Sequence, residues 1–272
     1  MNDLVDFARL VDALRPWLGN LVVVGGWAHR LYCFHPRAQL LPYKPIGTKD
    51  ADIAMSATPP SLGDLAAALK AADFQEELAG EYTPPVAQYR LAGQDAGFYV
   101  EFLAPLRGDG LTRSGATDAT VAWGGVTAQR LRYVDLLLVS PWNVRLDESI
   151  GFPLPEPAEL LLVNPVSFIA QKLLIQTKRP PDKLPQDVLY IHDTLELFGR
   201  DLDGLRAEWI ERVRPHVAQR TVMQIDRSRR RMFADVTDVI RRAVRIPQDR
   251  TLSPGRLRAA CEYALDTVFG ME

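Results

Sequence analysis

Two aspartates, Asp50 and Asp52, stand two positions apart at the start of an apolar stretch. Residues Ala51–Met55 predict a strand, and successive side chains of a strand face opposite ways, so both carboxylates point to one side. Two aligned carboxylates repel each other unless a cation lies between them or one is protonated. Hard oxygen ligands favour Mg²⁺ or Mn²⁺. The pair therefore indicates a divalent-cation site, although an isolated Asp-x-Asp also occurs by chance in turns.

The surrounding elements support a site at this pair. The run Leu21–Val24 predicts a strand buried on both faces, and Gly25-Gly26 ends it before a predicted helix over Trp27–Phe34. Backbone N–H groups at such a turn can bind phosphate. Glu101 lies in a later apolar strand, where a glutamate either faces solvent at an edge or joins a site. Three carboxylates on adjacent strands beside a glycine turn indicate two-metal phosphoryl transfer.

The remaining pattern divides the chain into an α/β part, residues 1–153, and a helical part, residues 154–272, with a proline-rich linker at Leu154–Pro157. Further expected strands and turns are a hairpin of Tyr89–Leu91 with Phe98–Leu103, and strands in Val121–Leu138 around Gly124-Gly125. Expected helices are Leu4–Leu18, Leu62–Ala72 capped by Ser61, a helix from Asn164-Pro165, Asp187–Phe198, Arg206–Val213, Thr221–Val244 and Ser253–Phe269.

The order of these parts resembles the nucleotidyltransferase fold of the DNA polymerase beta superfamily. The pieces are Leu21–Gly26, Asp50-Ala51-Asp52 and Glu101. The continuation from Asn164 through Lys172 to a basic loop is similar to bacterial abortive-infection-type nucleotidyltransferase-like proteins, and the resemblance covers roughly residues 20–200. It implies an α+β fold, a mixed sheet with flanking helices followed by an all-α domain. It also implies an NTP substrate such as ATP and Mg²⁺ or Mn²⁺ as cofactor.

The resemblance assigns the catalytic and metal-binding roles to Asp50, Asp52 and Glu101. The residues that it assigns to nucleotide binding are Gly25, Gly26, Trp27, Thr48, Lys49, Lys172, Arg179, Lys183 and Asp187. The family often has serine or threonine just after the glycines, where this chain has Trp27, so phosphate contact falls here on backbone N–H groups. The long gap between Gly26 and Asp50 leaves the loop His35–Gly47 to shape an acceptor or nucleotide pocket.

Lys172 and its neighbours predict a second group of site residues. We expect Lys172, Arg179 and Lys183 to neutralise a triphosphate at a cleft between the two domains. Asp187 either orients Lys172 or Lys183 or serves as a first-turn acid of its helix. We also expect Lys172→Ala to weaken NTP binding with little loss of stability.

Composition and charge exclude several classes of protein. The 272 residues include 32 Lys and Arg against 34 Asp and Glu, so the net charge of −2 does not indicate a globally basic nucleic-acid binder. Seven arginines between Arg227 and Arg245 form either a solvated helix face or a local polyanion-binding patch. The four histidines lack zinc-site spacing. An acidic N-terminus, short apolar runs and two widely separated cysteines, Cys33 and Cys261, predict a cytoplasmic chain without a membrane span.

The leading functional hypothesis is a metal-dependent nucleotidyltransferase that moves NMP from an NTP to a hydroxyl of an acceptor. The acceptor could be RNA such as a tRNA end, a protein, or a small molecule. The alternative is a catalytically inactive binding protein of the same fold or a toxin–antitoxin component. A DNA-binding regulator that uses the Arg227–Arg245 region is a third possibility, against which the acidic pI speaks. The oligomeric state stays open.

Overall fold

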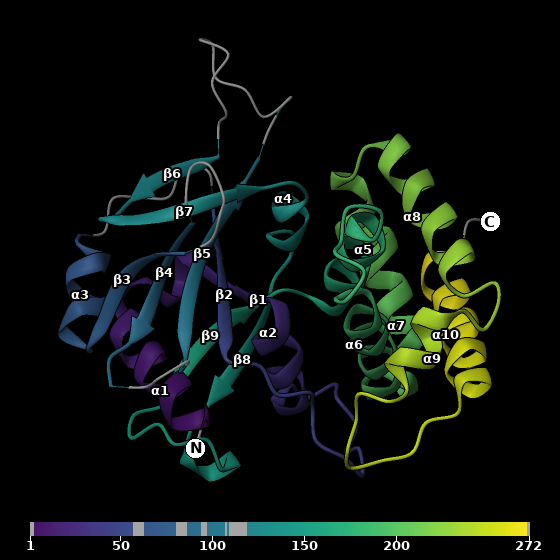
Figure 1. Ribbon diagram of the computed structural model, residues 1–272, viewed down its shortest axis with the longest axis horizontal. Coiled ribbons are helices and arrows are strands. Elements are labelled where there is room, and N and C mark those ends of the chain that lie inside the picture. Colours follow the sequence, from purple (N-terminus) through teal and green to yellow (C-terminus); the bar gives the residue numbers. More distant parts are fainter. Residues whose placement is uncertain are drawn as a thin grey trace. The chain divides into compact units, whose positions relative to one another are not determined.

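Residues 1–34 and 47–163 form the first of two compact units. The computed structural model (Figure 1) describes residues 3–56, 63–79, 86–93, 97–106, 108 and 119–270. Within these residues, nine strands form one sheet. They are β1 (Leu21–Val24), β2 (Asp50–Met55), β3 (Phe74–Ala79), β4 (Val86–Leu91), β5 (Tyr99–Pro105), β6 (Thr120–Trp123), β7 (Val126–Leu131), β8 (Trp142–Leu146) and β9 (Ala158–Leu162).

The sheet is mixed, as the family resemblance implied. Its main path runs β3-β4-β5-β2-β1-β9-β8, and β7 also pairs with β5 and with β6. β1 is antiparallel to β2, whereas β2 is parallel to β5 and β1 is parallel to β9. β1 is buried at every position and has a partner strand on each side, which explains its continuous run of leucine and valine. β1 and β2 therefore lie at the centre of the sheet.

The helix α1 (Asp3–Leu14) packs on one face of this sheet. The other helices of this unit are α2 (Gly25–Leu31), α3 (Leu65–Ala71) and α4 (Val134–Leu137), with 3-10 turns at Arg15–Asn20, Tyr32–Phe34 and Glu148–Ile150. Apolar side chains of α1 meet Leu21, Val23 and Ile53 around a small apolar void. Since Ile53 and Asp52 are adjacent in β2, the face under α1 is the one opposite Asp52.

Three expected elements of this unit differ from the observed ones. α1 ends at Leu14 and continues as a 3-10 turn, because Pro16 disfavours α-helical backbone at the residue before it. Asp64 is the N-cap of α3, where its side chain accepts from Ala67 N, while the expected cap Ser61 lies outside the described residues. The last part of the expected strand region forms the helix α4.

Residues 35–46 and 164–272 form the second unit. Its helices are α5 (Pro165–Ile175), α6 (Leu184–Leu197), α7 (Leu202–Ala207) continued by a π-helix (Glu208–Val213), α8 (Gln219–Met232), α9 (Asp238–Ala243) and α10 (Pro254–Phe269), with 3-10 turns at Gly199–Asp201 and Arg214–His216. Asn164 and Ser253 cap α5 and α10. The single helix expected over Thr221–Val244 is two helices, because Thr237 caps a new start by accepting from Ile240 N.

The division between the units differs from the expected one. It falls after Val163 instead of after residue 153, since β9 follows the proline-rich segment and joins the sheet beside β1. Residues 35–46, here called the strap, belong with the helices. Gln39 N donates to Leu197 O at 2.9 Å, and Arg37 pairs with Asp201. Within the described residues, no helix is both long and apolar enough to cross a bilayer.

Candidate active site

The three expected carboxylates lie on one face of the sheet. β2 and β5 are parallel, and their register places Asp52 opposite Glu101 and Asp50 opposite Tyr99. Paired residues of adjacent strands share a face, and residues two apart on one strand share it too. Asp50, Asp52, Tyr99 and Glu101 therefore point the same way, on the side of the sheet that α1 does not cover. We call this surface the acidic face.

Electrostatics on the acidic face favour proton uptake. Burial raises the pKa of Glu101, and Asp50 raises it further, while a hydrogen bond from Gln88 and the charge of Arg90 act in the opposite direction. Burial and then the charges of Asp50, Glu101 and Asp52 raise the pKa of Tyr99 to about 12. The charges of all three carboxylates thus raise the pKa of the same hydroxyl, that of Tyr99. A cation at this surface would relieve their mutual repulsion.

The glycine turn lies directly against this face. β1 is antiparallel to β2 with Val24 opposite Asp52, so Gly25 follows immediately beyond the aspartate. Gly25 has a φ of +62°, and a Cβ built on it would overlap the Asp52 carboxylate oxygen Oδ2. Only glycine allows both this backbone conformation and this close approach. On the other side, Thr48 Oγ1 donates to Asp50 Oδ1.

The other residues expected to bind nucleotide near the aspartates differ in where their side chains lie. Gly26 continues the first turn of α2, and Lys49 is exposed just before β2. The Trp27 side chain is fully buried and stacks on Phe7 with ring centroids 4.1 Å apart, so it belongs to the core. Its side chain cannot contact a nucleotide there. The backbone at Gly25 is the part of this segment that lies against Asp52.

Lys172, Arg179 and Asp187 meet inside the helical unit. Lys172 Nζ donates to Asp187 Oδ1 at 2.7 Å, and Arg179 Nε donates to Asp187 Oδ2 at 2.9 Å. The Lys172 and Asp187 side chains are 7% and 1% exposed. Asp187 therefore orients Lys172, one of its two expected partners. Lys183 is exposed at the N-cap position of α6. The expected cleft between the domains stays a prediction.

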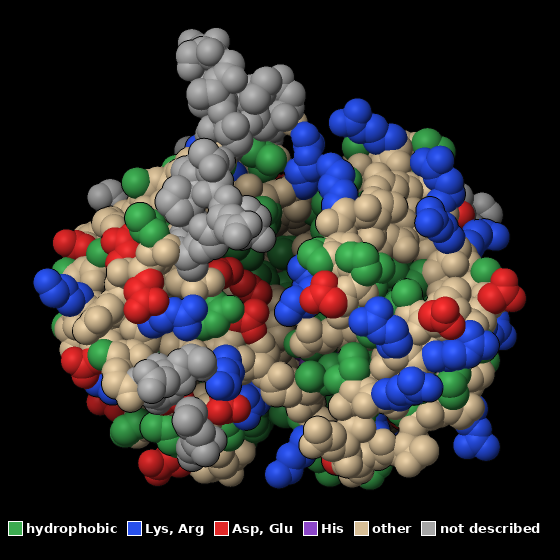
Figure 2. All heavy atoms as spheres, in the orientation of Figure 1, with side chains coloured by type: hydrophobic (Ala, Val, Ile, Leu, Met, Phe, Trp, Pro, Cys, Tyr) green, Lys and Arg blue, Asp and Glu red, His purple; other side chains and the backbone are tan. Residues whose placement is uncertain are grey.

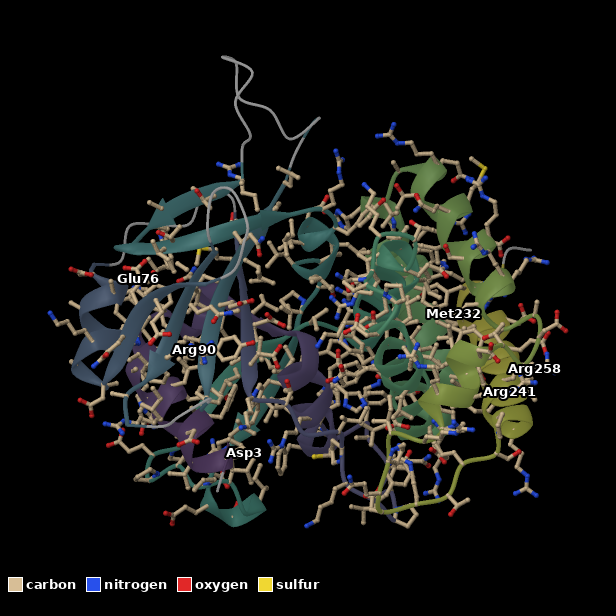
Figure 3. The ribbon with its side chains drawn as sticks, viewed as in Figure 1. Asp3, Glu76, Arg90, Met232, Arg241 and Arg258 are labelled. Carbon is tan, nitrogen blue, oxygen red and sulfur yellow. The ribbon has the colours of Figure 1, made fainter. Side chains whose placement is uncertain are left out.

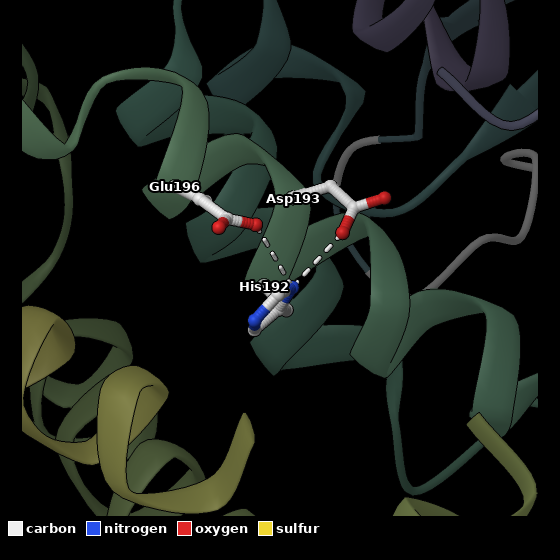
Figure 4. A group of neighbouring side chains, drawn as sticks. All are labelled: His192, Asp193 and Glu196. Carbon is white, nitrogen blue, oxygen red and sulfur yellow. Dashed lines mark hydrogen bonds and ion pairs between the residues drawn. The ribbon is translucent and has the colours of Figure 1, made fainter. Parts of the chain in front are cut away.

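A different group in the described residues brings three ligand atoms together. His192, Asp193 and Glu196 of α6 place one ligand atom each within 4.8 Å of one another (Figure 4), which the acidic face does not. Each carboxylate already has a cation or a hydroxyl as partner: Arg250 pairs with Asp193, and the Tyr43 hydroxyl donates to Glu196. The Tyr43 contact fastens the strap to α6. The strand register turns the three carboxylates of the acidic face to the same side of the sheet. Their oxygen atoms do not all lie within 4.8 Å of one another.

Figure 2 shows Lys and Arg side chains spread over the helical unit. Part of the arginine-rich segment is internally neutralised: Arg229 is buried and pairs with Asp226 and Asp266, and Arg230 also contacts Asp226. Arg227, Arg231 and Arg245 are exposed. Both interpretations of this segment, a solvated face and a polyanion patch, stay open.

Comparison with known families decides the class of the protein. A family model described as Nucleotidyltransferase matches residues 2–213. The chain belongs to this nucleotidyltransferase family. The match includes every strand of the sheet and the Lys172–Asp187 pair, while α8, α9 and α10 follow it. No curated protein matches this nucleotidyltransferase.

Sequence reasoning missed two residues that contact the acidic face of the nucleotidyltransferase. Gln88 Nε2 donates to Glu101 Oε1 at 2.6 Å, and Arg90 NH2 donates to Gln88 Oε1 at 2.7 Å. Both lie on β4, which pairs with the strand of Glu101. Their spacing of two positions in an otherwise apolar strand is the signal that could have found them, since it repeats the pattern of Asp50 and Asp52.

Proposed function

We propose that this nucleotidyltransferase transfers a nucleoside monophosphate from an NTP to a hydroxyl of an acceptor in a reaction that requires Mg²⁺ or Mn²⁺. The observation that carries the proposal is the register of β2 against β5, which pairs Asp52 with Glu101 and sets Asp50 on the same face. The order of these parts along the chain resembles the DNA polymerase beta superfamily, which supports the same reaction. RNA, protein and small molecules remain the candidate acceptors.

The donor set of the acidic face fits a hard divalent cation. Asp50, Asp52 and Glu101 all offer carboxylate oxygens, and the missing side chain of Gly25 keeps the space beside Asp52 Oδ2 clear. Their like charges on one face repel one another unless a cation lies between them or one of them is protonated. When bound, the cations would lower the pKa of the attacking hydroxyl and offset charge on the phosphates. The three side chains must turn toward one another to close on a cation.

The chain's own groups have two tasks in this reaction. The first turn of α2, at Gly25 and Gly26, offers backbone N–H groups for phosphate oxygens. The acceptor oxygen forms a bond to the α-phosphorus while the bond from the α-phosphorus to the bridging oxygen breaks, and pyrophosphate leaves. We assign the hydroxyl proton to the Glu101 carboxylate, which shares the acidic face with Asp50 and Asp52.

We propose the cations of the helical unit, Lys172, Arg179 and Lys183, as phosphate-binding residues for the NTP. Lys172 is fixed by Asp187 in a buried ion pair, while Arg179 and Lys183 are more exposed. Arg179, with a side chain 34% exposed, can turn from Asp187 to a phosphate more easily than Lys172 can.

Two radiolabels test this proposal. The purified chain is incubated with Mg²⁺, total cellular RNA or total protein, and each NTP labelled either at the α-phosphate or at the γ-phosphate. Nucleotidyl transfer predicts that α-label becomes attached to the acceptor and that γ-label does not. Attachment of γ-label would show phosphoryl transfer instead. No attachment in any combination, together with no binding of any NTP, would favour the inactive binding protein.

A further inference from the structure

A chain of polar contacts leads from the edge of the sheet to Glu101. β4 is antiparallel to β5 with Arg90 opposite Tyr99, so Arg90 shares the acidic face, and Gln88, two positions away, shares it too. Arg90 lies over the strands of the sheet in Figure 3. Gln88 Nε2 donates to Glu101 Oε1 at 2.6 Å. The Oε1 atom of Glu101 thus accepts a hydrogen bond from an uncharged donor.

The orientation of the Gln88 amide is itself fixed. Arg90 has no acceptor atom, and its donation to Gln88 Oε1 at 2.7 Å requires the amide oxygen to face it. The amide nitrogen must then face Glu101. Arg90 is held in turn by Glu77 at 2.8 Å and by the Tyr99 ring, whose centroid lies 4.7 Å from the guanidinium carbon. The relay therefore runs Glu77, Arg90, Gln88, Glu101.

An uncharged hydrogen-bond donor suits the position next to Glu101 better than a charged one. A lysine or arginine in direct contact with Glu101 would bring a positive charge next to any cation bound there. Gln88 supplies Glu101 Oε1 with a hydrogen bond that carries no net charge. Carboxylates that ligate metals are commonly oriented by such outer hydrogen bonds, and loss of one typically costs about 10–100-fold in metal affinity or activity.

We propose that Gln88 is a positioning residue for Glu101, and that Arg90 acts through Gln88 by fixing the direction of its amide. The inference rests on the proposed function, because it assigns Glu101 to the cation site. Gln88 touches neither substrate nor cation in this assignment. It sets the direction from which the Glu101 carboxylate is presented beside Asp52.

Manganese binding without nucleotide tests this role. The full chain is titrated with Mn²⁺ alone, and free Mn²⁺ is followed by its electron paramagnetic resonance. Gln88→Met keeps the side-chain length and removes the donor, so we expect Mn²⁺ to bind about 10-fold more weakly or worse. Arg90→Lys keeps the charge and loses the forked geometry, and we expect a smaller loss. Gln219→Met, at an exposed position at the start of α8, is the matched control and should bind as the unaltered chain does.

The kinetic readout separates positioning from general damage. If Gln88 only orients a ligand, Gln88→Met raises the Mg²⁺ concentration needed for half-maximal rate and leaves the rate at saturating Mg²⁺ within a few-fold. Equal Mn²⁺ affinity in Gln88→Met and the unaltered chain, while Glu101→Gln loses it, overturns the inference and leaves the proposed function intact. No Mn²⁺ binding by the unaltered chain overturns both. Should Gln88→Met fail to fold, Arg90→Lys decides by the same comparison.

Discussion

Gly25 is the residue whose substitution tests the packing of the glycine turn against the acidic face. Gly25→Ala adds a Cβ that overlaps Asp52 Oδ2 and forces a side chain into the left-handed region. The backbone alone should cost about 1–2 kcal/mol of stability, and displacement of Asp52 should abolish transfer. Gly151→Ala is the control, since Gly151 has a φ of +77° with open space around it. Both variants should lose similar backbone stability in urea unfolding, and only Gly25→Ala should lose activity. Full activity in Gly25→Ala would contradict the assignment.

The buried ion pair of Lys172 and Asp187 leads us to expect a loss of folding stability on substitution, which the sequence alone did not indicate. We expected little loss of stability for Lys172→Ala, but the ion pair is buried. Removing Lys172 leaves Asp187 with Arg179 alone, and we expect about 3 kcal/mol of destabilisation, the low end for breaking a buried pair. The double variant Lys172→Met/Asp187→Leu should recover part of this loss in urea unfolding. A Lys172→Met variant as stable as the parent would show that the pair does not form.

At the scale of elements, the sequence predicted the strands that carry the site. The Leu21–Val24 run indicated a buried strand, and the spacing of Asp50 and Asp52 indicated a shared face, because both features depend on local periodicity. The register of β2 against β5 could not be read from one sequence, since it depends on pairing between distant segments. The break between α8 and α9 was missed because Thr237 acts as a helix cap in a stretch that otherwise has helical periodicity.

The strap gives a prediction on pH at the element scale. His35 Nδ1 accepts from Arg37 N at 3.2 Å, which requires a neutral ring nitrogen. Burial, followed by the charge of Arg37, lowers the pKa of His35 from 6.5 to about 4, and Asp201 opposes this. The unfolded chain takes up this proton near pH 6.5 and the folded chain only near pH 4. The contribution of His35 to stability is therefore complete above pH 6.5 and is lost as the pH falls toward 4.

Nuclear magnetic resonance of the imidazole protons measures this directly. The resonance that disappears in His35→Gln should titrate with a midpoint near pH 4 in the folded chain. The urea midpoint of the parent should fall more steeply than that of His35→Gln between pH 6.5 and pH 4. A His35 midpoint near 6.5 would show that the strap does not hold the ring as described.

At the scale of the whole molecule, the fold class followed from the change of pattern along the chain. Alternating strands precede a series of helices, and this order depends only on local composition. Membership of the strap in the helical unit was not foreseen, because contacts such as Tyr43 to Glu196 join residues far apart in sequence. The same holds for Gln88, whose role depends on the pairing of β4 with β5.

The central claim is that the acidic face carries a metal-dependent nucleotidyl transfer. Its most direct test is the rate of attachment of α-labelled NTP in Mg²⁺ by Asp52→Asn, measured beside the parent and beside Asp12→Asn, an exposed control in α1. Asp52→Asn should fold with equal or greater stability, since it removes like-charge repulsion. We predict that its rate falls by at least about 100-fold, whereas Asp12→Asn matches the parent. Unchanged transfer in a folded Asp52→Asn would contradict the account.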